Sequence, residues 1–185
     1  HKLLKSIVRE SIPVLTLAAL FDLIAGISIE KRLDSLLEYP VLLVLLPGFL
    51  GTAGGLGGVL SSRLSTKLHL GLLQPGTVPK GSSGADIAMI FALSIPVFAI
   101  TALVAQSGGM LFNQASPGVF NLLAVALVGG LFATVCVVIV AYYATIIAVR
   151  FGLDPDTHGI PMVTSALDFV GAFTLILALV MLGLG

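Results

Sequence analysis

Two aspartates of this chain lie within apolar stretches, where carboxylates are rare. Asp168 falls between Ile160 and Leu184, a stretch long enough to cross a bilayer that contains no Lys or Arg. Asp22 lies in the first apolar segment. A charged group at the centre of a membrane helix costs roughly 3 kcal/mol or more, so such residues mark candidate functional sites. Acidic groups without basic partners at this depth favour a cation path; alternatively, each aspartate is protonated or hydrogen-bonded at a helix junction.

The polar residues before Asp168 have helical spacing. Thr164 lies four positions and Ser165 three positions before it, so the hydroxyls share a helix face with the carboxylate. Asp154 lies at the expected entrance. Hard divalent cations take oxygen ligands, and Mg²⁺ keeps several waters while one or two carboxylates hold it. The pattern predicts a sparse divalent-cation site; alternatively, the hydroxyls bond a carbonyl one turn earlier, and Asp154 belongs to an ordinary turn and helix start.

Residues 47–58 read Pro-Gly-Phe-Leu-Gly-Thr-Ala-Gly-Gly-Leu-Gly-Gly, within a segment of membrane length. This composition predicts a membrane helix interrupted by Gly and Pro, which a bilayer tolerates only where the freed backbone groups face protein or water. Carbonyl oxygens there are candidate cation ligands, at Gly51, Thr52, Gly54 and Gly55. Gly51 and Gly55 are also four apart, a spacing that lets two helices approach closely, and helix packing alone is the alternative.

The composition places these residues in a membrane. Hydrophobic residues make up 57% of the 185 residues and charged residues 10%, against about 25% charged in soluble domains. Since a span needs about 20 mostly apolar residues, we predict five helices, at residues 11–29, 39–62, 86–106, 119–149 and 159–184. The first is counted as a span rather than a cleavable signal sequence. The expected fold is an all-α integral membrane domain over residues 1–185, multi-pass in the cell membrane.

The distribution of Lys and Arg predicts the orientation. With five spans, one side carries Lys2, Lys5, Arg9, Arg63, Lys67, Lys80 and Arg150, and the other only Lys31 and Arg32. The richer side is cytosolic, which places the N-terminus in the cytosol. A net charge of zero implies no nucleic-acid partner. The chain begins at His1 rather than Met, consistent with a piece of a longer protein that includes a cytosolic domain.

The region around Asp168 resembles the membrane domain of MgtE-type magnesium channels and the related solute-carrier magnesium transporters. The positions that match the family spacing, with Ser replacing the second Thr of a Thr-Thr-like pair, are Leu153, Asp154, Pro155, Pro161, Thr164, Ser165 and Asp168. The segment Ser62-Arg63-Leu64-Ser65-Thr66 is similar to the solute-carrier branch. The family usually has Asn in its Gly-rich segment. This chain has none between Pro40 and Pro75, and Thr52 or Gly55 occupies that register.

The resemblance implies a function and an assembly. It implies a divalent-cation channel or transporter, most naturally for Mg²⁺, rather than an enzyme. It further implies a homodimer of five-helix subunits in the lipid bilayer, with a pore on the two-fold axis lined by the second and fifth helices. Two copies of Asp168 would then face one ion, and C₂ symmetry is the commonest homo-oligomeric symmetry.

Other functions remain open at this stage. A proton- or Na⁺-coupled secondary transporter of another solute would also use Asp22 or Asp168, and a purely structural subunit predicts that Asp168→Asn is silent. An intramembrane aspartyl protease is disfavoured because Ser165-Ala166-Leu167, and not Gly-x-Gly, precedes Asp168. Gly81-Ser82-Ser83-Gly84 matches a serine-protease pattern, but it lies in a polar loop and no His lies within a span to act as base. Arg63 is expected to anchor its helix end at the headgroups.

Overall fold

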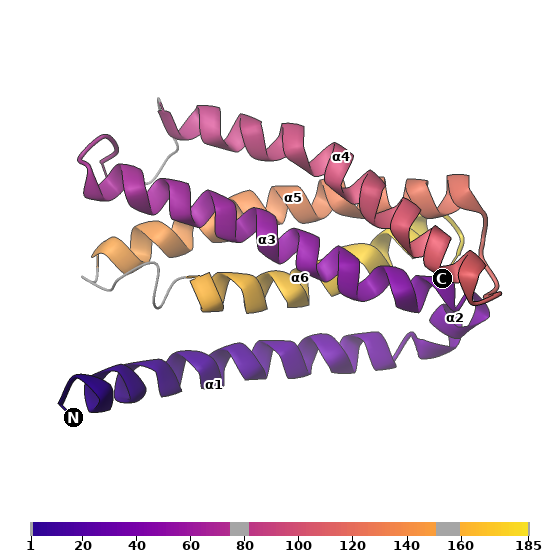
Figure 1. The fold of residues 1–185 in the computed structure, drawn as a ribbon, viewed down its shortest axis with the longest axis horizontal. Coiled ribbons are helices and arrows are strands. Elements are labelled where there is room, and N and C mark those ends of the chain that lie inside the picture. The colour runs from indigo at the N-terminus through magenta and orange to yellow at the C-terminus, as the bar shows by residue number, and fades with distance from the viewer. Residues whose placement is uncertain (1, 75–81, 151–159, 185) are drawn as a thin grey trace.

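The regular elements of the protein are all helices in the part of the chain that the structure describes. The computed structural model describes residues 2–74, 82–150 and 160–184 (Figure 1). The helices are α1 (Lys2–Glu30), α2 (Leu33–Glu38), α3 (Val41–His69), α4 (Ser82–Leu111), α5 (Val119–Arg150) and α6 (Ile160–Met181). The prediction of an all-α fold is therefore confirmed for these residues. The short helix α2 was not predicted.

Successive long helices run in opposite directions along one bundle (Figure 1). The central helix is α3, which packs against α4, α5 and α6, while α1 packs against α6 at the edge of the bundle. The first and last described residues lie at opposite ends of the long axis. This antiparallel arrangement brings the predicted second and fifth membrane helices, α3 and α6, into direct contact.

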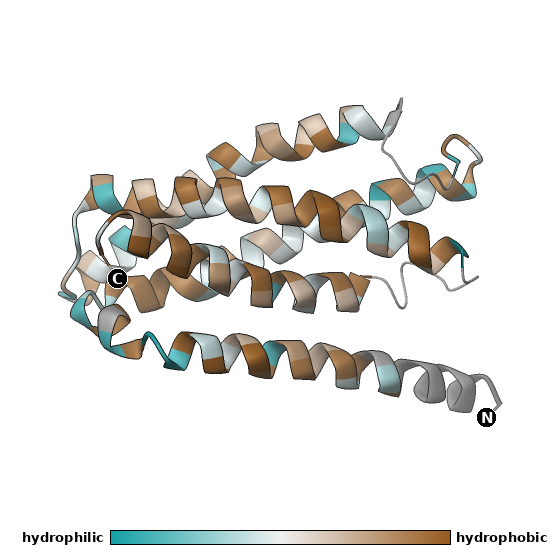
Figure 2. Cartoon of the chain, turned by 180° about the vertical axis from the view of Figure 1, so that it is seen from behind, coloured by the Kyte–Doolittle hydropathy of each residue, from teal (hydrophilic) through white to brown (hydrophobic). Residues whose placement is uncertain are grey.

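The outer surface of the bundle is apolar. Within the described residues, four helices are long and apolar enough to cross a membrane, at Val41–His69, Ser83–Leu111, Val119–Arg150 and Ile160–Met181. Large apolar side chains such as Ile95 and Val104 are more than half exposed, and hydrophobic colour covers most of the length of these helices (Figure 2). Lipid chains cover such a surface in a bilayer. The chain is therefore a multi-pass membrane protein. The predicted first span, residues 11–29, lies within α1.

Glycines opposite aromatic rings make the interior of the bundle compact. Phe49 of α3 and Phe98 of α4 are buried with their ring centroids 4.8 Å apart. A Cβ at Gly130 of α5 would lie 2.5 Å from Cδ2 of Phe98, and one at Gly129 would lie 3.2 Å from Cζ of Phe49. Between helices surrounded by lipid, such close packing is a main source of association. It fixes the position of α3 between α4 and α5.

The structure does not contain the predicted interruption of the second membrane helix. Helix α3 runs unbroken from Val41 to His69, with Pro47 inside it. Glycine retains its N–H, so a glycine-rich run can continue the hydrogen-bond ladder from residue i to residue i−4, and Pro47 removes only one bond near the helix start. The helix also continues past the predicted end at residue 62. This extension carries Arg63 and Lys67 on its last turns.

Candidate functional site

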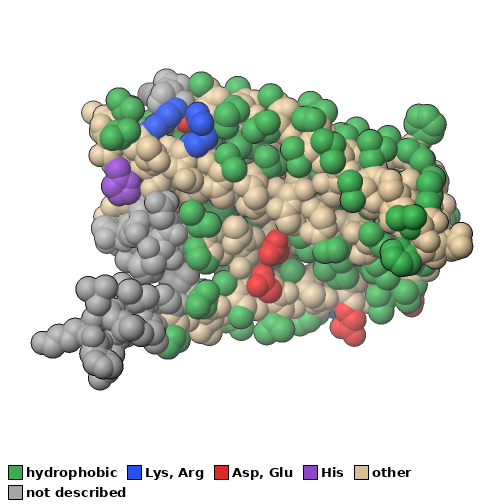
Figure 3. Space-filling view, in the orientation of Figure 1, with side chains coloured by type: hydrophobic (Ala, Val, Ile, Leu, Met, Phe, Trp, Pro, Cys, Tyr) green, Lys and Arg blue, Asp and Glu red, His purple; other side chains and the backbone are tan. Residues whose placement is uncertain are grey.

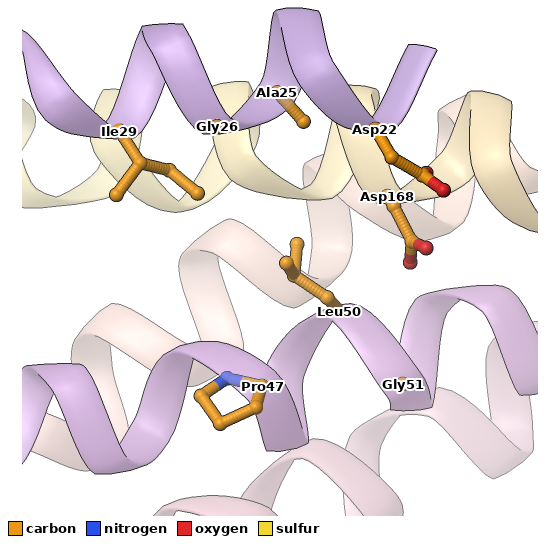
Figure 4. Close-up of a pocket in the computed structure, with 8 residues that line it drawn as sticks. All are labelled: Asp22, Ala25, Gly26, Ile29, Pro47, Leu50, Gly51 and Asp168. Carbon is orange, nitrogen blue, oxygen red and sulfur yellow. The ribbon is translucent and has the colours of Figure 1, made fainter. Parts of the chain in front are cut away.

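A cavity between α1, α3 and α6 contains both membrane aspartates. Its volume is about 390 Å³ (Figure 4). Helix α6 contributes Asp168, α3 contributes Pro47, Leu50 and Gly51, and α1 contributes Asp22, Ala25, Gly26 and Ile29. The α1 residues follow the i, i+3, i+4, i+7 spacing of one helix face. Asp22 was predicted from the sequence as a site residue. The residues that share its helix face were not, although their helical spacing is present in the sequence.

The two aspartates lie side by side at the cavity, and no described Lys or Arg forms a salt bridge with either of them. Asp168 is half-buried and Asp22 is exposed, and their carboxylates are close enough for their charges to interact. Their side chains lie next to each other at the cavity (Figure 4). In the space-filling view, acidic side chains lie together midway along the visible face of the molecule (Figure 3). A cation from outside the protein would relieve the repulsion between them.

Gly54 brings α3 next to Asp168. A Cβ built at Gly54 would lie 3.8 Å from Oδ1 of Asp168 and 3.7 Å from Cβ of Thr164. One turn further, a Cβ at Gly57 would lie 2.2 Å from Cδ1 of Leu167, so only glycine fits without a shift of that leucine. These glycines let the two backbones approach closely, as small residues do between membrane helices. Of the glycines predicted as ligand positions, Gly54 is thus the one that packs against α6.

Three other glycines of α3 face open space. A Cβ at Gly51, Gly55 or Gly58 would meet no heavy atom within 4 Å. Gly51 and Gly55 are exposed, and Gly51 also lines the cavity beside Asp168. The predicted spacing of four between Gly51 and Gly55 therefore does not serve helix packing within the described subunit. It leaves a smooth, open strip on α3 next to the two aspartates.

The hydroxyls before Asp168 are placed differently from each other. Oγ1 of Thr164 donates a hydrogen bond to the Pro161 carbonyl at 3.0 Å, which is the backbone bonding considered as the alternative for this residue. Its oxygen retains a lone pair, and the residue lies beside Gly54. Ser165 is 8% exposed. The structure therefore brings Thr164, Asp168 and Gly54 together.

Thr52, another predicted ligand, does not line this cavity. Oγ1 of Thr52 lies 3.0 Å from Oγ1 of Thr101 on α4, so its side chain faces a different neighbour. Asp154 lies outside the described residues. Among the residues that are described, no group of three or more His, Cys, Asp and Glu side chains forms a preassembled metal cluster. A cation that keeps much of its water needs only one or two carboxylates from the protein.

Another carboxylate, Asp86, lies outside this cavity and was not predicted to pair with the basic residues at the end of α3. Arg63 Nη2 lies 2.8 Å from Oδ1 of Asp86, and Lys67 Nζ lies 2.5 Å from Oδ2. The expectation that Arg63 extends outward to the headgroups is therefore corrected: its guanidinium pairs with α4. A sequence signal existed in the i, i+4 spacing of Arg63 and Lys67, but not in the identity of their partner. Asp86 follows a polar loop, and only the folded chain brings it to α3.

A comparison with protein families identifies the family of this chain. The model of MgtE divalent cation transporters matches residues 46–178. The matched range contains the glycine-rich part of α3 and Asp168, while Asp22 precedes it. No curated protein and no solved structure matches the chain significantly. Since the family model covers most of the chain, with the α3–α6 contact inside the matched range, the chain belongs to the MgtE family of divalent cation transporters.

Proposed function

We propose that this divalent cation transporter moves Mg²⁺ and that Asp168 is the key ligand on its ion path. The observation that carries the proposal is the carboxylate of Asp168 on α6, a helix able to cross the membrane, at a cavity where no described Lys or Arg compensates it. A divalent cation would supply the missing charge. The half-buried position lets Asp168 contact an ion that remains partly hydrated.

The size of the cavity suits a hydrated ion. Six waters occupy roughly 180 Å³ at about 30 Å³ each, and the cavity measures about 390 Å³. Mg²⁺ loses its waters reluctantly and is usually held by one or two carboxylates. In this proposal Asp168 contacts the hydrated ion directly or through water, and Asp22 contributes from the cavity wall. Thr164 lies next to Gly54, at the approach to Asp168, and Ser165 lies behind them. The backbone beside Gly51, Gly54 and Gly55 borders the path, and Asp154 stands at its entrance.

The open glycine strip on α3 supports a homodimer. Gly51, Gly55 and Gly58 have no neighbour within the subunit that would contact a Cβ. Small residues on membrane helices permit a second helix or an ion to come close. A second copy placed against α3 and α6 would set two Asp168 carboxylates around one divalent ion, so that the ion neutralises both. The pore in this proposal lies on the two-fold axis and is lined by α3 and α6, within a single transport domain.

The proposed topology has five spans with the N-terminus in the cytosol. The apolar part of α1 is the first span in chain order and adds to the four spans of α3 to α6. The Lys and Arg count sets the orientation of the chain in the membrane. Met110, 62% exposed near the end of α4, should then lie on the outer side. A membrane-impermeant thiol reagent should label Met110→Cys in intact cells, in a Cys136→Ala background. Labelling only after the cytosolic face is opened would contradict the topology.

Uptake measurements test the proposed function. Purified protein in vesicles should take up Mg²⁺ down its gradient, and Asp168→Asn should remove this uptake because a neutral amide cannot replace an anionic ligand. Asp34→Asn, the same substitution on the exposed helix α2, is the matched control. Wild-type uptake by Asp168→Asn would refute the ligand role. Uptake of another solute that strictly requires a proton or Na⁺ gradient would favour the secondary transporter instead.

A further inference from the structure

A buried carboxylate joins the ends of α3 and α4. The side chain of Asp86 is 2% exposed and lies between Arg63, 47% exposed, and Lys67, 21% exposed. Arg63 donates from Nε and Nη2 to Oδ1 at 2.9 and 2.8 Å, and Lys67 donates to Oδ2. We call these three residues the charged tie. Basic side chains gather at this end of the molecule (Figure 3).

The charged tie lies at one end of a longer contact between α3 and α4. At the other end a Cβ on Gly109 would lie 2.6 Å from Cγ2 of Val41, so the helices are in close contact there. Midway, the hydroxyls of Thr52 and Thr101 lie 3.0 Å apart. Polar and small residues thus hold α3 to α4 along its length. The charged tie is the part of this contact where long side chains, rather than close backbones, make the connection.

The α3 residues that contact α4 occupy a different face from those at the candidate ion path. Thr52, Arg63 and Lys67 point to α4, whereas Gly51 lines the cavity and Gly54 lies beside Asp168. In a helix of 3.6 residues per turn, fixing one face fixes the rotation of all others. Contacts to α4, together with those to α5, therefore influence how the glycines are presented to α6.

We propose that Asp86 is a positioning residue for the ion path. Through Arg63 and Lys67 it fixes the rotation of α3, and so the placement of the glycine face relative to Asp168. The inference rests on the proposed function of Asp168. Arg63 and Lys67 are four residues apart on one helix, where like charges repel. Without the carboxylate between them, the two cations separate and release the end of α3.

Transport kinetics test the positioning role. Substitutions that act through a packed element change function by roughly 2- to 30-fold, and we expect Asp86→Asn to lower the maximal Mg²⁺ uptake rate within this range. The KM for Mg²⁺ should change less, because Asp168 is untouched. Asp86→Glu should restore the rate, since a carboxylate can still reach both cations. Asp34→Asn on exposed α2 serves as the control.

A distance measurement tests the same role without relying on transport. Spin labels at Ser62→Cys on α3 and Ala85→Cys on α4, both exposed positions, report the separation of the two helix ends in a Cys136→Ala background. The distance distribution should be narrow in the otherwise unmodified chain, broader with Asp86→Asn and narrow again with Asp86→Glu. If Asp86→Asn does not fold, Arg63→Gln takes its place, because Arg63 is half-exposed and its loss leaves Asp86 paired to Lys67. Since one of the two ion pairs is lost, this variant should also broaden the distance distribution, by less than the loss of both pairs.

The outcomes separate this inference from the proposed function. An unchanged distance distribution in the folded Asp86 and Arg63 variants overturns the positioning role whatever the transport results. Wild-type uptake kinetics for Asp86→Asn, in a protein that Asp168→Asn inactivates, overturns the positioning role alone. Absence of Mg²⁺ uptake by the unmodified chain refutes the proposed function, and the spin labels then still decide whether the charged tie holds α3 to α4.

Discussion

Asp86 and Asp168 carry the same side chain on long apolar helices, but their surroundings are opposite. Asp86 is 2% exposed and bonded to two cations of α3. Asp168 shares a cavity with a second carboxylate, and no described Lys or Arg pairs with it. Loss of a carboxylate that the protein compensates leaves its basic partners unpaired and destabilises the fold, whereas a carboxylate without compensation requires a cation from outside. We therefore interpret Asp86 as structural and positioning, and Asp168 as the ion ligand.

The two contacts of α3 show the same division. Toward α4 it uses hydrogen bonds and ion pairs between side chains. Toward α6 it uses glycines, one of which lies beside Asp168. A helix that is fixed by side-chain contacts on one face and carries glycines on another can line an ion path without blocking it. Substitutions on the two faces should therefore differ in their main effect: stability falls first on the α4 face, and transport falls first on the α6 face.

The largest expected effect is on transport, at Asp168. Asp168→Asn should reduce Mg²⁺ uptake at least about tenfold, the equivalent of about 1.4 kcal/mol of lost ion stabilisation. Its heat stability in detergent should not fall, because the wild-type carboxylate has no salt bridge to lose and faces the charge of Asp22. Parallel uptake and thermal unfolding assays check this. A large loss of stability would show that Asp168 is structural.

For Asp86→Asn the main expected effect is on stability rather than on transport. Removing one partner of a buried ion pair costs about 3–5 kcal/mol, and the exposure of Arg63 should reduce this to roughly 2 kcal/mol. For a chain of this size that corresponds to a fall of several degrees in the unfolding temperature, at about 2–4 °C per kcal/mol. Thermal unfolding of Asp86→Asn beside Asp168→Asn measures the difference. Equal stability of the two variants would remove the distinction between the carboxylates.

The effect of a Gly→Ala substitution on α3 should depend on whether the added methyl group meets a neighbouring side chain. Gly51→Ala and Gly55→Ala meet no atom within 4 Å, so they should keep or raise stability, by up to about 1 kcal/mol, while transport falls if the strip borders the path. Gly57→Ala places its Cβ against Leu167 and should destabilise by about 1–3 kcal/mol. Uptake and unfolding of the three variants test this. Full transport by stable Gly51→Ala and Gly55→Ala would remove the strip from the path.

The smallest effect is expected at Thr52. Thr52→Val loses one hydrogen bond to Thr101, worth about 1 kcal/mol, and should leave Mg²⁺ uptake and its KM nearly unchanged because the side chain faces α4. Thr101→Val, which removes the same bond from the other side, is the matched variant. A specific loss of Mg²⁺ affinity in Thr52→Val alone would return Thr52 to the candidate ligands.

Part of this architecture could be predicted from the sequence. Apolar segment lengths predicted the long helices, and the motif around Asp168 predicted the family. The continuity of α3 was missed because glycine composition does not reveal whether neighbouring helices hold a segment helical, as α4, α5 and α6 do here. Boundaries were also displaced, since polar ends such as that of α3 are stabilised by contacts and not by local composition.

The partners of individual side chains were the least predictable feature. The approach of Asp22 to Asp168 depends on the docking of α1 on α6, and the orientation of Thr52 depends on the rotation of α3 in the bundle. Arg63 finds Asp86 only because α4 returns beside α3. Such pairings join residues distant in sequence, and no local periodicity encodes them. The residue types at the site were therefore predictable, but which of them meet was not.

The central claim, that Asp168 binds the transported divalent cation, can be tested by locating the ion directly. Mn²⁺ accepts the same oxygen ligands as Mg²⁺ and can be identified by its anomalous X-ray scattering in crystals of the membrane protein. We expect an Mn²⁺ peak beside Asp168, on a two-fold axis where the carboxylates of both subunits face it. Asp168→Asn crystals should lose the peak. A bound ion elsewhere in the membrane region, with none at Asp168 in the wild-type protein, would show that Asp168 does not bind the transported cation.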